Sequence, residues 1–121
     1  MKKLVLALSL FILPLWGEDQ RDQKRFVGEI ADSSCALNVH SLTRSHREML
    51  LGKGMGKTAA DCSRICVQHY GSHYVFEDKK QNVFNLDDQK KAAQFAGAHV
   101  IVTGELMSKD MIHVVAIERE K

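Results

Sequence analysis

The chain has 121 residues, of which 17 are Lys or Arg and 15 are Asp or Glu, so its formal net charge is only +2. This length allows one domain with a modest core and excludes a chain of several full-sized domains. The chain lacks the basic surplus with which proteins bind phosphate backbones, so its composition argues against a nucleic-acid partner.

The first 17 residues have the pattern of a secretory signal peptide. Lys2 and Lys3 precede an apolar stretch from Leu4 to Leu15, which is shorter than the roughly 20 residues that span a bilayer. Cleavage after Gly17 is expected and leaves 104 residues, in which 15 basic residues face 15 acidic ones. We therefore expect a periplasmic or secreted protein with no stable membrane insertion after cleavage, and an uncleaved membrane anchor is the alternative.

After a polar lead over residues 18–25, five segments have the composition and alternation of β-strands. In the first, residues 26–31, alternation places Phe26, Gly28 and Ile30 on one face. The other four predicted strands cover residues 74–77, 83–86, 99–106 and 111–118.

Three helices are expected between these strands. The longest begins at Thr58, where Asp61 completes a start signal of the capping-box kind, and it ends before Gly71, a residue suited to a left-handed terminator. A shorter helix begins at one of two aspartates and lies within residues 87–97. A third is expected over residues 41–51.

This order of elements predicts a mainly β protein with short helices. Five strands with a helix between the third and the fourth is the order of the OB fold, a small barrel that binds ligands on its middle strands and on two of its loops. We therefore expect one OB-fold-like domain over residues 26–121, with a helical insertion over residues 35–71 between strands one and two. That insertion carries all three cysteines.

The cysteines have the most distinctive chemistry in the chain. Their number, three, is odd, so disulfides within one chain cannot use all of them. On the predicted helix Cys62, Cys66 and His69 are spaced to project from one face, which would let them converge on one ion. Thiolate sulfur and imidazole nitrogen favour zinc or copper over calcium or magnesium.

A tetrahedral site needs a further ligand from outside this helix. Cys35 is the obvious candidate, and His40 or His46 would replace His69 if the preceding segment folds across the helix. Asp32, three residues before Cys35, is a candidate ligand or an outer-shell hydrogen-bond acceptor.

A disulfide is the competing interpretation of the same cysteines. Cys62 and Cys66 pair poorly on a helix, because residues four apart lie near the upper limit of the Cα separation that a disulfide tolerates. A bridge from Cys35 to either of them is easier and would give a disulfide-stapled structural or protein-interaction domain without metal. The third cysteine would then be free to join two copies into a homodimer.

Catalytic patterns are absent from the sequence. Neither a Ser-His-Asp order nor a close carboxylate pair of the kind that hydrolases use stands out in it. A thiol redox protein is the third interpretation, and it would require a lowered cysteine pKa. We expect a binding module that is not an enzyme, with a protein or cell-envelope partner.

Three stretches together resemble a family of small exported bacterial proteins of unknown function with a predicted OB-like barrel. They are Asp32-Ser-Ser-Cys35, the run from Cys62 through Cys66-Val67 to Val75, and the closing run from Val100 to Leu106. The resemblance covers most of residues 26–118, and it implies the domain type and the cysteine pattern D-S-x-C … C-x-x-x-C-V. It implies no established activity, substrate or catalytic residue.

Overall fold

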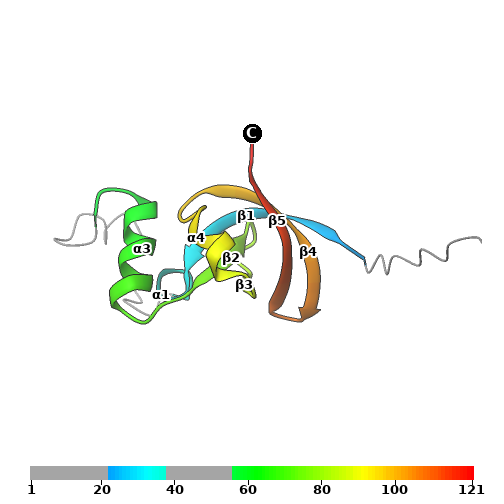
Figure 1. The fold of residues 1–121 in the computed structure, drawn as a ribbon, viewed down its shortest axis with the longest axis horizontal. Helices are drawn as coiled ribbons and strands as arrows, with labels where there is room; N and C mark the ends of the chain where they lie inside the picture. Colours follow the sequence, from blue (N-terminus) through cyan, green and yellow to red (C-terminus); the bar gives the residue numbers. More distant parts are fainter. Residues whose placement is uncertain (1–21, 38–55) are drawn as a thin grey trace, which may run out of the picture.

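A computed structural model of the chain describes residues 22–37 and 56–121 (Figure 1). The expected signal peptide, the expected helix over residues 41–51 and the two candidate ligands His40 and His46 lie outside these ranges. Within them, no helix is both long enough and apolar enough to cross a membrane.

The predicted mainly β architecture, with five strands and a few short helices, is confirmed. The strands are β1 (Lys24–Asp32), β2 (Tyr74–Asp78), β3 (Val83–Leu86), β4 (His99–Ser108) and β5 (Met111–Arg119). They are hydrogen-bonded in the order β1-β2-β3-β5-β4, and β4 pairs with β1, so the sheet closes on itself. All neighbouring pairs are antiparallel except β3 and β5, which are parallel.

The start of β1 differs from the sequence prediction. β1 begins at Lys24, where this residue pairs with Gly104 of β4, so Lys24 and Arg25 belong to the sheet and not to the polar lead. Both side chains are exposed. The alternation of apolar residues begins only at Phe26, so the sequence pattern predicts a strand start two residues after the observed one.

The core lies inside the closed sheet. Alternate residues of the strands point inward, and the most deeply buried include Ile30, Phe76, Val100, Val102 and Ile112, each fully enclosed. Such alternation is the signature of a sheet with one face packed on a core and the other toward solvent.

Two of the helices follow the predicted start and stop signals. In α3 (Ala59–His69), the Thr58 hydroxyl caps the first turn by accepting a hydrogen bond from the Asp61 N–H at 3.1 Å. Gly71, with φ of 70°, follows the helix as predicted. α4 (Gln89–Ala93) is capped by Asp88, and it contributes Ala92 to the core.

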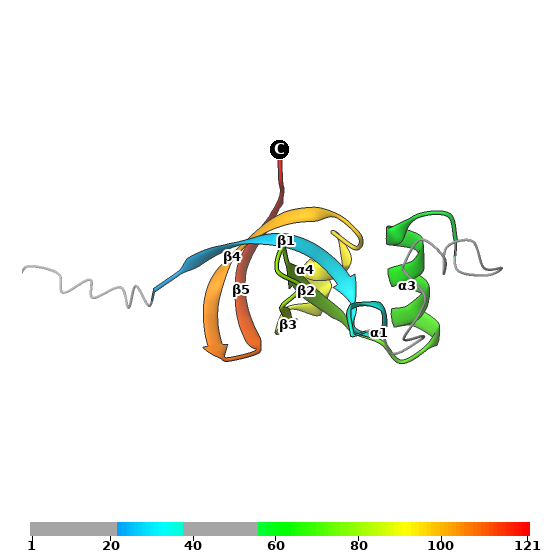
Figure 2. The ribbon, with the colours of Figure 1, turned by 180° about the vertical axis from the view of Figure 1, so that it is seen from behind.

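A third helix, α1 (Ser33–Ala36), is a single turn that continues directly from β1. In two opposite views α1 and α3 lie next to each other at one end of the sheet, away from the turn that joins β4 to β5 (Figures 1 and 2). The cysteine-bearing helices therefore form a separate layer beside the closed sheet.

Candidate functional site

Asp32 determines where the first cysteine points. It is the last residue of β1 and the N-cap of α1, and its Oδ2 accepts a hydrogen bond from the Cys35 N–H at 3.0 Å. The side chain is completely buried. This bond ends the strand and turns the chain, which brings Cys35 toward α3.

Hydrogen bonds among three serines connect α1 to the segment that follows α3. The Ser72 hydroxyl donates to Asp32 Oδ2 at 3.2 Å and lies 3.1 Å from the hydroxyl of Ser33. The Ser34 N–H donates to the same Ser72 oxygen at 3.0 Å. Because Ser72 follows α3 and the other residues belong to α1 or its cap, these bonds fix α1 relative to the end of α3.

The three cysteines meet in the space between these helices. Cys62 and Cys66 lie one turn apart on α3 and are fully buried, while Cys35 on α1 is half-buried. All three sulfur atoms lie within 4.8 Å of one another, and the Cys35 and Cys62 sulfurs are 3.9 Å apart. Sulfur atoms that share a tetrahedral zinc, each at about 2.3 Å from the ion, are about 3.8 Å apart. The spacing therefore matches that of thiolates around one metal ion.

No disulfide joins Cys35, Cys62 or Cys66 to one another. A disulfide bond is about 2.05 Å long, whereas the Cys35 and Cys62 sulfurs are 3.9 Å apart. The structure thus lacks the bridge from Cys35 to Cys62 or Cys66 that the competing interpretation required.

The environment of the thiols keeps them protonated at neutral pH. Burial raises the pKa of Cys35, and the negative charge of Asp32 raises it further. Burial and the same carboxylate raise the pKa of Cys66 to about 12, and burial also raises the pKa of Cys62. Redox-active thiols need a lowered pKa, so this environment disfavours thiol exchange chemistry. A metal cation would replace the thiol protons.

His69 does not join the cysteines, contrary to the sequence prediction. It is exposed in the last turn of α3, and it is not among the ligand atoms that converge. The prediction used the angular spacing along the helix, which is nearly right for a common face. Seven residues also rise by about 10 Å along the axis, and this distance separates His69 from Cys62.

Two buried polar atoms at this site lack hydrogen-bond partners among the described residues, Asp32 Oδ1 and the Ser63 hydroxyl. Such atoms cost free energy when they leave water without a partner. Asp32 is not one of the residues whose ligand atoms all lie within 4.8 Å of one another, and its bond to the Cys35 N–H would suit an outer-shell role. Sequence reasoning missed Ser63 and Ser72, because serine is common and these contacts follow no spacing rule.

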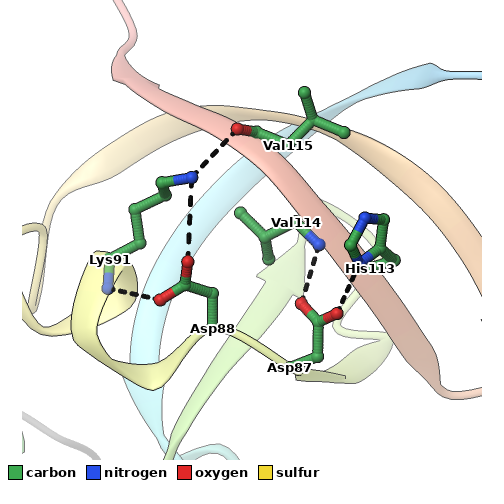
Figure 3. Close-up of polar contacts among 6 residues, drawn as sticks. All are labelled: Asp87, Asp88, Lys91, His113, Val114 and Val115. Atoms are coloured by element: carbon green, nitrogen blue, oxygen red, sulfur yellow. Dashed lines mark hydrogen bonds and ion pairs between the residues drawn. The ribbon is translucent and has the colours of Figure 1, made fainter.

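A second polar cluster lies on the sheet, at the turn from β3 into α4 (Figure 3). Asp87 accepts hydrogen bonds from His113 Nδ1 at 2.5 Å and from the Val114 N–H at 2.8 Å. These residues line an open pocket of about 460 Å³ together with Asp88, Gln89 and Lys90. Because both Asp87 oxygens are used in tying the turn to β5, the cluster has a clear structural role.

Comparison with known proteins finds similarity to one protein family and assigns no activity to the chain. No curated protein and no solved structure matches the chain. Residues 66–120 match a family model described as a protein of unknown function (DUF5818). The matched segment begins at Cys66 and runs through β2, β3, α4 and β4 to the end of β5. Over this segment, the chain is similar to a family whose function is unknown.

Proposed function

We propose that this protein is a small binding module that takes up one zinc or copper ion through Cys35, Cys62 and Cys66. The observation that carries the proposal is the convergence of three sulfur atoms within 4.8 Å. Soft thiolate ligands select zinc and copper over calcium and magnesium. The three cysteines come from two helices, so their meeting reflects the tertiary fold and not only their spacing in α3.

Each residue of the site has a defined role in this proposal. The cysteines bind as thiolates and give up their protons as the ion enters. Asp32 holds the Cys35 N–H and so orients this ligand from the outer shell. Copper(I) is satisfied by three thiolates, whereas tetrahedral zinc needs a fourth ligand, for which His40 and His46 are the sequence candidates.

The setting we propose for this site is an OB-like barrel in an exported protein. The strand order β1-β2-β3-β5-β4 and the position of α4 between β3 and β4 support the OB assignment. The cysteine site then occupies the connection between the first two strands, one of the ligand-binding loops of such barrels. The basic and apolar residues at the start of the sequence support a periplasmic or secreted location.

Native mass spectrometry combined with thiol counting tests the proposed metal binding. Reduced protein prepared without oxygen is mixed with one equivalent of Zn(II) or Cu(I). We expect one ion per chain and three thiols that are shielded from an alkylating reagent. The single variants Cys35→Ser, Cys62→Ser and Cys66→Ser should each lose the stoichiometric ion, and His69→Ala should keep it. Absence of stoichiometric metal, or equal retention by all four variants, would contradict the proposal.

A further inference from the structure

α3 lies beside one end of the sheet (Figure 2), and it adds few residues to the hydrophobic core. Its fully buried residues are two cysteines and a serine, Cys62, Ser63 and Cys66. The described residues of the hydrophobic core come from the strands and from α4 with its following turn, and α3 adds only the partly buried Val67. Apart from Val67 and the two small thiol side chains, α3 buries little apolar surface, so the hydrophobic effect gives it only modest stabilisation in its docked position.

The surface that α3 covers is also polar. Asp32 Oδ1 and the Ser63 hydroxyl are both enclosed without a hydrogen-bond partner among the described residues. Desolvating such atoms opposes docking. The bonds of Ser72 to Asp32 and Ser34 offset part of this cost, but they act only at the end of α3.

The candidate ligands come from both sides of this surface. Cys35 belongs to α1, which is continuous with β1, whereas Cys62 and Cys66 belong to α3. An ion bound by all three would cross-link α3 to the end of β1. In structural thiolate sites the free energy of metal binding contributes directly to folding.

We propose that metal binding is what docks α3 against the sheet, and that α3 opens in the metal-free protein while the sheet stays folded. This inference rests on the proposed metal site and extends it, because it makes the ion a structural clip whose presence controls the position of α3.

A contact outside the cysteine cluster offers an independent way to weaken docking. Gly97, which follows α4 with φ of 72°, lies against the start of α3, where an added Cβ would be 2.4 Å from the Ala60 nitrogen. Gly97→Ala should therefore push α3 away without touching a ligand. Coupling between two events is reciprocal, so a change that weakens docking must also weaken metal binding.

Gly71→Ala is the matched control for this variant. Gly71 has nearly the same left-handed conformation, with φ of 70°, but an added Cβ would meet nothing within 4 Å. Both variants bear the backbone cost of placing alanine in this region. Only Gly97→Ala adds a steric conflict with α3.

Hydrogen–deuterium exchange of the full reduced chain tests the inference directly, with and without one equivalent of the ion that native mass spectrometry shows to be retained, Zn(II) or Cu(I). We expect exchange in residues 59–69 to slow by roughly tenfold or more on metal binding, and exchange in β4 and β5 to change by less than about twofold. A bound ion with unchanged exchange in residues 59–69 would overturn the inference and leave the metal site standing. Failure to bind either ion would overturn both.

The metal affinities of the two glycine variants provide a second test. Gly97→Ala should bind the same ion about tenfold more weakly than Gly71→Ala, by competition with a chromophoric chelator. Equal affinity of the two variants would overturn the inference. Hydrogen–deuterium exchange in β4 and β5 of Gly97→Ala shows whether the sheet of this variant is intact. If the sheet is lost, the exchange of residues 59–69 in the wild type alone decides whether metal binding docks α3.

Discussion

The carboxylate of Asp32 accepts a hydrogen bond from the Cys35 N–H at 3.0 Å, and this bond brings the first cysteine to the other two. The same carboxylate is fully buried and raises the pKa of the Cys35 and Cys66 thiols. Asp32 thus has two effects on the site: it positions one ligand, and it keeps the metal-free thiols protonated.

Removing the charge of Asp32 should lower the pKa of the thiols. In Asp32→Asn the amide oxygen can still accept the bond from Cys35, while the negative charge near Cys66 is gone. We expect the absorbance change of thiolate formation near 240 nm to occur at lower pH than in the wild type. Asp110→Asn, an exposed site in the turn between β4 and β5, serves as the control. A thiol titration identical in Asp32→Asn and the wild type would show that this charge is not the cause.

Metal binding should release protons and strengthen as pH rises. Because the pKa values of Cys35, Cys62 and Cys66 are raised, their thiols carry protons at neutral pH that an ion must displace. Each proton released makes the affinity rise about tenfold per pH unit below the thiol pKa. Calorimetry in buffers of different ionisation enthalpy should find about three protons released per ion. Binding without proton release would mean that the thiols are not the ligands.

Loss of the Ser72 hydroxyl should destabilise the protein and weaken the site. This hydroxyl bonds to Asp32 and to the serines of α1, so Ser72→Ala leaves buried partners unsatisfied and should cost about 1–3 kcal/mol of unfolding free energy. Urea denaturation measures this change, and a metal titration should show weaker binding. Ser108→Ala removes an exposed hydroxyl that bonds to Asp110, and it should have little effect on either quantity. Equal effects of the two variants would contradict the role of Ser72.

The Asp87 and His113 pair should make stability depend on pH in the acidic range. Burial opposes the charged form, but the bonds from the Val114 N–H and from His113 outweigh it and lower the pKa of Asp87. A folded-state pKa below the unfolded one adds stability above the unfolded pKa, and this is lost as pH falls through the folded value. Asp87→Asn should cost about 1 kcal/mol or less at pH 7, because the pair is partly exposed.

The loss in Asp87→Asn should shrink when denaturation is repeated at acidic pH, where the wild-type carboxylate takes up its proton. Asp110→Asn again provides the exposed control. A destabilisation that is the same at both pH values would mean that the charge of Asp87 does not contribute.

Much of the sheet could be predicted from sequence because alternation reports directly which face of a strand is buried. The segments 74–77 and 83–86 were found almost to the residue. The start of β1 was missed, because Lys24 and Arg25 pair with β4 through their backbones while their side chains remain in solvent.

The candidate site was predictable only in part. The i, i+4 spacing brings Cys62 and Cys66 to one helix face, and the capping signal at Thr58 locates that helix. The arrival of Cys35 from another element depends on how the chain turns at Asp32, and the bonds of Ser72 connect residues about 40 positions apart. Such contacts are tertiary, so no local pattern reveals them.

X-ray absorption spectroscopy at the metal edge of the loaded protein tests the central claim most directly. We expect a first shell dominated by sulfur, with three scatterers at about 2.3 Å from zinc or slightly less from copper(I). Cys35→Ser should bind too weakly to retain one ion per chain, and with excess metal any ion that it holds should have only two sulfur scatterers. A first shell that contains only nitrogen and oxygen, or one that is unchanged in Cys35→Ser, would contradict a metal site made by these three cysteines.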